Sequence, residues 1–208
     1  MTDQGFFLSF EGIDGSGKST QARLLADALT RQDREVVTTR EPGGSPGAEE
    51  IRALLLTGDA DRWSAETEIL LFTAARRDHL ERTVAPAVEN GRIVICDRFA
   101  DSTRVYQGVG RTSRRETVDA LHRLMIEREP DLTVLIDIDP AISLERAIAR
   151  ADGEARFESF GLEMQQRMRD AFLALAREFP ERFIVIDGNH DTQTVACNVM
   201  KMVTERLP

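Results

Sequence analysis

The sequence is poor in cysteine and has no long hydrophobic run. Its two cysteines, Cys96 and Cys197, have neither the CxxC spacing nor the spacing of metal ligands. We therefore expect two buried free thiols in a reducing cytosol. No run of roughly eighteen or more apolar residues occurs, and the N-terminus has no basic segment followed by an apolar stretch. These absences predict a cytoplasmic location and no membrane contact.

Positive charge is also in short supply. Lys and Arg number 27 against 36 Asp and Glu, so the formal net charge is −9. This balance opposes non-specific binding to a nucleic-acid polymer, and any phosphate ligand must be held by local positive charge. His79, His122 and His190 lack the spacing of a metal site or a catalytic triad, so we expect them to be surface or packing residues. The 208 residues fit a single domain, 1–208, without internal repeats or linkers.

A glycine-rich stretch lies near the N-terminus. Gly12, Gly17, Lys18 and Ser19 occupy the fixed positions of a phosphate-binding loop, in which backbone N–H groups converge on an anion. Lys18 would reach the β- and γ-phosphates, and the Ser19 hydroxyl would bind Mg²⁺. A chance match in a glycine turn is the alternative. The residues predicted to bind ATP are Gly12, Ile13, Asp14, Gly15, Ser16, Gly17, Lys18, Ser19 and Thr20.

The surroundings of this loop and the rest of the chain predict an α/β fold. An apolar run at 6–10 precedes the loop and a helical pattern at 21–29 follows it, as the motif requires. Further strands are predicted at 35–39, 93–96, 132–138 and 183–186, and helices at 48–56, 64–89, 141–151, 162–178 and from 192 on. Pro86 should kink or divide the helix at 64–89. Such alternation predicts a five-stranded parallel sheet with helices on both faces and ligands at the carboxyl ends of its strands.

Charged residues stand at two of these strand ends. Asp97 would hold Mg²⁺ directly or through water, or else cap the next helix. Arg98 and Arg40 suit the bidentate binding of a second phosphate. Either arginine could instead pair with a surface carboxylate.

Two further groups of residues invite a functional interpretation. Phe72 and Arg76 are four positions apart, so they share a helix face, and a ring beside a guanidinium can stack on a base and hydrogen-bond to it. Arg146, Arg150 and Arg156 flank a polar interruption and suggest a lid at about 146–160 that closes over a transferring phosphoryl group. The alternatives are a core phenylalanine, a solvated arginine and a solvated helix face.

Together these segments resemble the thymidylate kinase family, nucleoside monophosphate kinases that phosphorylate dTMP with ATP. The resemblance runs nearly end to end. It is carried by residues 10–20, by Thr39-Arg40-Glu41-Pro42-Gly43-Gly44, by Leu71-Phe72-Thr73-Ala74-Ala75-Arg76, by Asp97-Arg98-Phe99 with Ser102-Thr103, and by Tyr106-Gln107-Gly108. It implies a P-loop NTPase three-layer sandwich, ATP and dTMP as substrates, Mg²⁺ as cofactor and a homodimer packed through helices.

The resemblance also implies how the acceptor nucleotide is bound. Phe72 would stack on thymine, and Arg76 and Thr103 would recognise its polar edge. Tyr106 would pack beneath the deoxyribose, where a 2′-hydroxyl would crowd it. Asp14 would lie near the sugar 3′-hydroxyl. Arg98 and Arg40 would hold the dTMP phosphate.

The source of the catalytic arginine follows from one position in the loop. Some members of the family carry an arginine where this chain has Gly15. The chain therefore resembles the bacterial subclass, which supplies its catalytic arginine from the lid, and Arg150 and Arg156 are the candidates. Lys18 and Arg98 complete the predicted catalytic set. The alternatives are a kinase for another nucleoside monophosphate or a deoxynucleoside and, more distantly, a GTPase-like switch, although the sequence has no Asn-Lys-x-Asp motif.

Overall fold

A five-stranded parallel sheet forms the centre of the molecule. The structure is a computed structural model that describes residues 5–59, 62–108, 114–150 and 161–208. Within these ranges the strand order is β2-β3-β1-β4-β5, and all neighbouring strands are parallel. The strands are β1 (Phe6–Glu11), β2 (Val36–Arg40), β3 (Ile93–Asp97), β4 (Leu132–Asp137) and β5 (Phe183–Asp187). The predicted sheet is confirmed, and no strand end is shifted by more than one residue.

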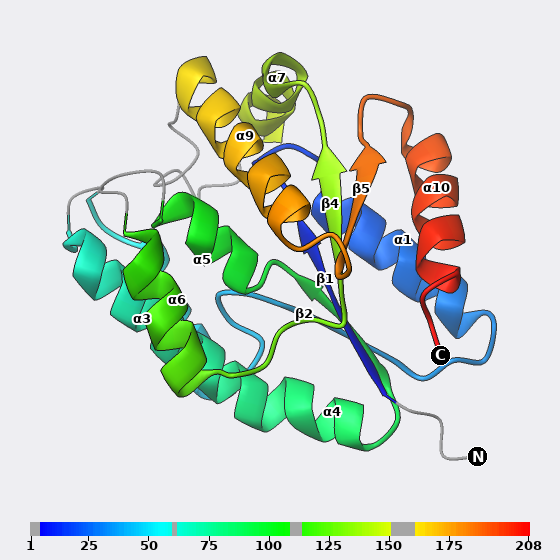
Figure 1. Ribbon diagram of the computed structural model, residues 1–208, viewed down its shortest axis with the longest axis horizontal. Helices are drawn as coiled ribbons and strands as arrows, with labels where there is room; N and C mark the ends of the chain where they lie inside the picture. The colour runs from blue at the N-terminus through cyan, green and yellow to red at the C-terminus, as the bar shows by residue number, and fades with distance from the viewer. Residues whose placement is uncertain (1–4, 60–61, 109–113, 151–160) are drawn as a thin grey trace.

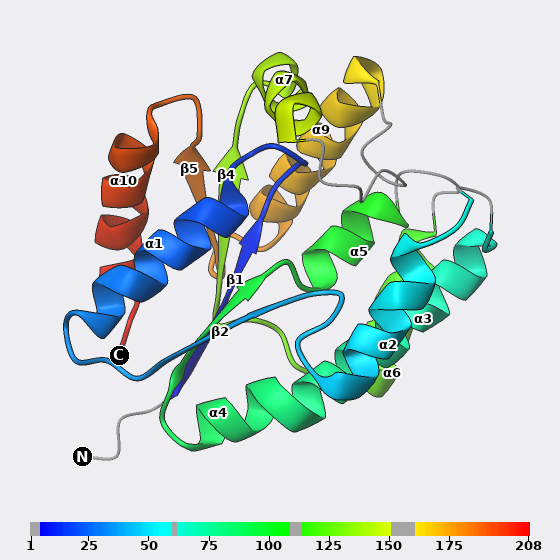
Figure 2. The ribbon, with the colours of Figure 1, turned by 180° about the vertical axis from the view of Figure 1, so that it is seen from behind.

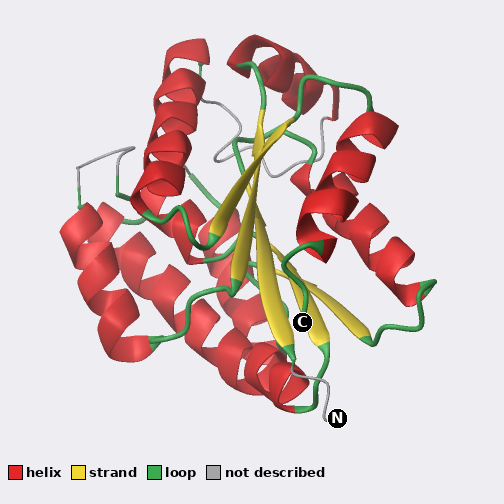
Figure 3. Ribbon diagram, turned by 45° about the vertical axis from the view of Figure 1, so that its right-hand side comes forward, coloured by secondary structure: helices red, strands yellow, loops and turns green. Residues whose placement is uncertain are grey.

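Helices cover both faces of the sheet (Figures 1 and 2). On one face lie α1 (Lys18–Thr30) and α10 (Thr192–Thr204), which pack against each other. The other face is covered by α3 (Ala65–His79), α4 (Ala85–Glu89), α5 (Ala100–Tyr106), α6 (Arg115–Met125) and α9 (Leu162–Glu178). Two helices extend this layer, because α2 (Pro46–Leu56) packs on α3 and α7 (Pro140–Arg150) packs on α9. Figure 3 shows the strands enclosed between the two helical layers, so the predicted three-layer arrangement is confirmed.

The core explains why the strands are apolar on both faces. Leu8, Phe10 and Ile95 pack toward α1 and α10, whereas Phe7 and Val94 pack toward the opposite layer. Successive residues of a strand point to opposite sides, so a strand that is covered twice must be apolar at nearly every position. Burial on both faces fixes the register of the central strands and brings their carboxyl ends to one edge.

The predicted helix at 64–89 is divided into three parts. The α-helix α3 is followed by a π-helical turn, η1 (Leu80–Val84), and then by α4, which has Pro86 in its first turn. Proline has no N–H, and its ring clashes with the carbonyl four residues earlier in a regular α-helix. The wider π-helical turn upstream of Pro86 accommodates the proline ring, so the helix continues past it in the same direction.

One prediction about the cysteines was wrong. Cys96 is buried in β3, as expected, but Cys197 is exposed on α10. Val195 and Val199 are buried against the sheet, and the residue midway between them points away from it. The histidines agree with the prediction, since His79 and His122 are buried and His190 is exposed. Among the described helices, none is both long and apolar enough to cross a membrane.

Candidate active site

The glycine loop joins the end of β1 to the start of α1, as the motif requires. Gly17 caps α1 with a φ of 93°, and Gly15 has a φ of 85°. A Cβ on Gly15 would lie 2.1 Å from the Ser143 carbonyl oxygen, so in this chain a side chain here would clash with α7. The buried Ser16 hydroxyl has no hydrogen-bond partner among the described residues. The loop thus brings backbone groups and a free donor to the N-terminus of α1, where an anion is favoured.

Lys18 is folded back over this loop. Its ammonium donates to the Ile13 carbonyl oxygen at 3.2 Å and lies 3.8 Å from a carboxylate oxygen of Asp14. Burial and then the charge of Arg98 lower the pKa of Lys18 from 10.5 to about 8. An incoming phosphate would stabilise the charged form, because it adds negative charge beside the ammonium group.

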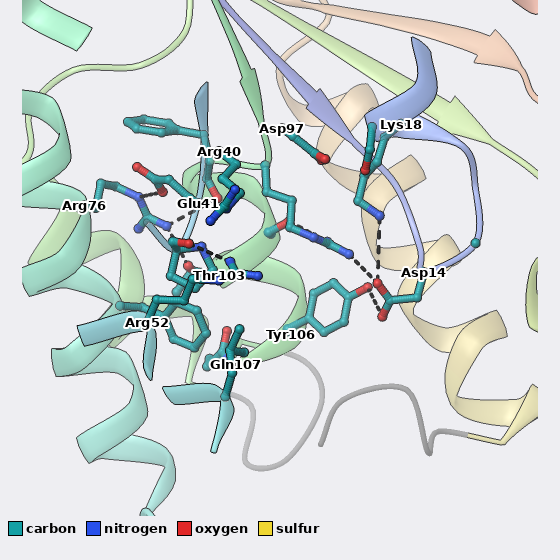
Figure 4. A pocket seen from close by; sticks show the side chains of 18 residues that line it. Asp14, Lys18, Arg40, Glu41, Arg52, Arg76, Asp97, Thr103, Tyr106 and Gln107 are labelled. Atoms are coloured by element: carbon teal, nitrogen blue, oxygen red, sulfur yellow. Dashed lines mark hydrogen bonds and ion pairs between the residues drawn. The ribbon is translucent and has the colours of Figure 1, made fainter. Parts of the chain in front are cut away.

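Asp14 is the meeting point of three side chains from different elements. Arg98, which follows β3, makes a short ion pair with one of its oxygens, and the Tyr106 hydroxyl on α5 donates to the other at 3.1 Å. Lys18 approaches the same carboxylate, as Figure 4 shows. The Arg98 guanidinium also donates to the Ser102 hydroxyl at 3.0 Å. Arg98 is held in a left-handed conformation with a φ of 71°, and such strain is typical of functional positions.

Beneath this cluster, a buried carboxylate connects β1 to α5. Glu11 accepts hydrogen bonds from the Phe99 N–H at 2.7 Å and from the Ser102 hydroxyl at 2.6 Å. Burial, followed by the charge of Asp101, raises the pKa of Glu11 to about 7 despite these two donors. Glu11 holds the residues around Arg98 in place and does not itself line the cavity.

A second polar group lies at the other end of the site, between α3 and α5. Arg76 is 3% exposed, and it donates from Nε to Glu41 at 2.7 Å and from one terminal nitrogen to the Thr103 hydroxyl at 2.8 Å. Burial would raise the pKa of Glu41, but Arg76 and His79 outweigh it and lower that pKa, so the carboxylate is ionised at neutral pH. Arg76 therefore sits in a fixed, charge-balanced setting, with Phe72 one helical turn away.

Both groups line one cavity of about 580 Å³. The predicted site residues along its wall are Asp14, Gly15, Lys18, Ser19, Arg40, Phe72, Arg76, Asp97, Arg98, Thr103 and Tyr106. Residues from the loop, from the ends of β2 and β3, and from α3 and α5 thus meet in one place. This convergence is what the topology of a parallel sheet predicts.

Arg40 takes a different position from Arg98. It is exposed, and its guanidinium lies 3.2 Å from both carboxylate oxygens of Glu49. This is the surface ion pair that the sequence left open as an alternative. Such an exposed pair is worth little and can be exchanged for another anion. A role for Arg40 in binding the second phosphate stays a prediction.

Asp97 and Ser19 fit the chemistry of a Mg²⁺ site. One carboxylate oxygen of Asp97 is buried and has no hydrogen-bond partner in the described part of the chain. Ser19 is exposed at the start of α1, and both residues line the cavity. No group of three or more His, Cys, Asp or Glu among the described residues could hold a metal alone. The two residues suit an ion that takes most of its ligands from phosphate and water.

The two predicted lid arginines lie at and beyond the edge of the described residues. Arg150 is the last residue of α7, and nothing is described of its side chain, whereas Arg156 lies outside the described residues. The segment proposed as a lid at 146–160 is therefore described only at its N-terminal end.

Several residues of the wall had no role assigned from the sequence. Among them are Glu41, Arg52 and Gln107. Glu41 and Gln107 belong to segments that carry the family resemblance, so their positions gave a signal. Arg52 gave none, because an arginine on an amphipathic helix is normally solvated. It lies on α2, where one of its terminal nitrogens donates to the Pro42 carbonyl oxygen at 2.7 Å.

The fold and this cavity define the class of protein: a P-loop protein of the nucleoside monophosphate kinase type. A sequence model of thymidylate kinase matches residues 10–199. The chain belongs to the thymidylate kinase family.

Individual relatives agree with this assignment. The chain is 66% identical over 207 residues to a thymidylate kinase of Ruegeria pomeroyi, with 100% of this chain and 98% of that protein covered. It is 50% identical over 205 residues to the thymidylate kinase of Caulobacter vibrioides, covering 98% of each chain. Among solved structures, thymidylate kinase from Ehrlichia chaffeensis superimposes with a TM-score of 0.78 at 37% identity, covering 96% of this chain and 98% of that one.

Proposed function

We propose that this chain transfers the γ-phosphoryl group of ATP to dTMP, giving dTDP and ADP. The observation that carries the proposal is the single cavity, which runs from the phosphate loop at Lys18 to Phe72 and Arg76. One end suits a nucleoside triphosphate and the other a stacked base, so a donor and an acceptor phosphate would meet between them. Membership of the thymidylate kinase family supports dTMP as the acceptor.

At the acceptor end, each side chain has a role that its setting supports. Phe72 stacks on thymine, and Arg76 and Thr103, which are already joined by a 2.8 Å hydrogen bond, bind the polar edge of the base. Tyr106 lies beneath the deoxyribose. Asp14, which accepts from the Tyr106 hydroxyl, faces the sugar 3′-hydroxyl.

Between the two nucleotides, the chain supplies positive charge. Arg98, with Arg40 recruited from Glu49, binds the dTMP phosphate, and Lys18 moves from the Ile13 carbonyl to the ATP phosphates. Because the second pKa of a phosphate monoester is about 6, the acceptor is mostly dianionic at neutral pH and needs no general base. The chain acts by aligning the two phosphates and neutralising charge, and Arg150 or Arg156 adds a cation from the lid. Mg²⁺ held by Ser19 and Asp97 would neutralise further phosphate charge.

Two other expectations stay predictions. The resemblance implies a homodimer packed through helices, which light scattering would detect. The cytoplasmic location rests on the composition of the sequence.

An acceptor panel tests the proposed function. ADP release would be measured with ATP and, in turn, dTMP, dUMP, AMP, GMP, CMP and thymidine. We expect dTMP to give the highest kcat/KM. If another monophosphate or thymidine gave the highest kcat/KM, that compound would be the acceptor in place of dTMP. Slow GTP hydrolysis that depends on no acceptor would overturn the kinase assignment in favour of a switch.

A further inference from the structure

A chain of buried polar contacts runs behind Arg76, and the phosphoryl transfer does not use it. One carboxylate oxygen of Glu41 accepts a hydrogen bond from Nε of Arg76, and the other lies 2.9 Å from Nδ1 of His79. Nε2 of the same imidazole lies 2.7 Å from the Thr39 hydroxyl. The contacts thus run in series from Thr39 through His79 and Glu41 to Arg76, and Thr103 completes them on the far side.

Burial increases the free-energy cost of losing any of these contacts. His79 is 0% exposed and Glu41 is 6% exposed. An ionised carboxylate only accepts hydrogen bonds, so Nδ1 of His79 must carry the proton, and Nε2 of a neutral ring then accepts from Thr39. Without His79, one oxygen of a buried carboxylate would lose its donor, which costs far more than the same loss at the surface.

The backbone is shaped around this imidazole. Gly44, with a φ of +84°, closes over the ring, and a Cβ at that position would lie 2.6 Å from it. His79 is three residues after Arg76 on α3, so both project from one helix face toward the loop that carries Glu41. One carboxylate is thereby held by two donors of the same helix, which fixes its orientation as well as its charge.

We propose that His79 is a positioning residue for base recognition: it orients Glu41, and Glu41 aims the guanidinium of Arg76 into the cavity. The proposal rests on the proposed function for the identity of the base. Nη1 of Arg76 has no hydrogen-bond partner among the described residues, while Nε and Nη2 are held by Glu41, Thr103 and the Phe99 carbonyl. Nε and Nη2 fix the plane of the guanidinium group, and Nη1 is the donor that remains for the base.

The test is a double-mutant cycle on dTMP binding. Dissociation constants for dTMP and for ATP would be measured by titration calorimetry for the wild type, His79→Phe, Arg76→Met and the double variant. We expect His79→Phe to weaken dTMP binding about ten- to a hundredfold and to leave ATP binding within twofold, the range for a lost hydrogen bond to a charged group. In the Arg76→Met background, His79→Phe should change the dissociation constant for dTMP less than twofold, because the guanidinium that Glu41 positions is absent.

A pair of conservative variants covers the case in which His79→Phe fails to fold. The amide nitrogen of Asn superimposes on Nδ1 of His, and that of Gln on Nε2. His79→Asn should therefore keep dTMP affinity close to that of the wild type, while His79→Gln loses it. A matched control is His122→Phe, which removes a buried histidine that lies 3.1 Å from Glu129 and does not itself line the cavity. We expect that variant to bind dTMP normally.

The outcomes separate this inference from the proposed function. Equal losses for dTMP and ATP, additive effects in the cycle, or equal behaviour of the Asn and Gln variants would overturn the positioning role. If the wild-type protein did not bind dTMP, the proposed acceptor would be overturned instead. The cycle would then be measured with whichever monophosphate the acceptor panel selects, since the inference concerns the base that Arg76 meets.

Discussion

The hydroxyl of Tyr106 donates a 3.1 Å hydrogen bond to Asp14 and so ties α5 to the phosphate loop. Tyr106→Phe keeps the ring but releases one oxygen of that carboxylate. We expect KM for dTMP to rise roughly fivefold, the equivalent of about 1 kcal/mol for one hydrogen bond, with little change in KM for ATP. Tyr106→Ala, which also removes the ring, should lose discrimination against a ribonucleotide acceptor. A Tyr106→Phe enzyme with a normal KM for dTMP would show that the bond is dispensable.

Phe72 is expected to carry the stacking energy of the base. Phe72→Ala should raise KM for dTMP roughly ten- to a hundredfold, as aromatic–base stacking does elsewhere, and leave KM for ATP unchanged. Leu70 lies on the same helix and is 57% exposed, so Leu70→Ala is a matched control that should behave as the wild type. Steady-state kinetics with each substrate varied in turn would measure both effects. Equal losses for the two nucleotides would contradict the assignment.

The pKa of Lys18 predicts how binding depends on pH. Because burial and Arg98 lower this pKa to about 8, the side chain is mostly charged at pH 7 and half neutral near pH 8. ATP binding needs the charged form, so affinity should fall as the pH rises above about 8, by at most about tenfold per unit. Lys18→Arg keeps its charge at all these pH values and should remove the alkaline decline, whatever its activity. Lys18→Ala should cut turnover by orders of magnitude.

Glu11 predicts a pH dependence of stability. Its folded-state pKa is raised from 4.5 to about 7, so between these values the folded protein holds a proton that the unfolded chain has lost. The free energy of unfolding should therefore decrease as pH rises through this window, by at most about 1.4 kcal/mol per unit from this group. Glu11→Gln keeps the shape and an acceptor for the Phe99 N–H, and it should flatten that slope. Urea titrations at several pH values would measure it, and an unchanged slope would show that Glu11 is ionised throughout.

The lid prediction rests on two arginines, Arg150 and Arg156. The residue that reaches the γ-phosphate should, when changed to Ala, lower kcat by on the order of 10³-fold with a small change in KM, because its contact forms in the transition state. The other should have a much smaller effect. Single-turnover rates of the two Ala variants would distinguish them. If both variants turned over normally, the catalytic arginine would have to come from elsewhere.

Much of the site follows from local patterns. Strand ends are readable because a strand buried on both faces is an apolar run, and the residue that ends it is conspicuously polar, as at Asp97. The loop at Gly12 to Ser19 is readable because its glycines and Lys18 are close in sequence. The partners of these residues are less readable. Glu41 holds Arg76, 35 positions away, and no spacing rule connects a turn to a helix at that distance.

The sequence by itself determined the α/β class, the phosphate loop and the edge of the sheet at which the predicted site residues gather. Hydrophobic periodicity and the alternation of strands with helices are local properties, and parallel packing brings the carboxyl ends of the strands to one edge. Only the tertiary structure decided which way each side chain turned. Arg40 and Arg98 both end strands, yet one faces Glu49 on the surface and the other faces Asp14 inside. His79, unremarkable in sequence, is buried and contacts Glu41, the carboxylate that holds Arg76. Burial selects such partners, since a charge removed from water must find a counter-charge among whatever residues the fold brings near.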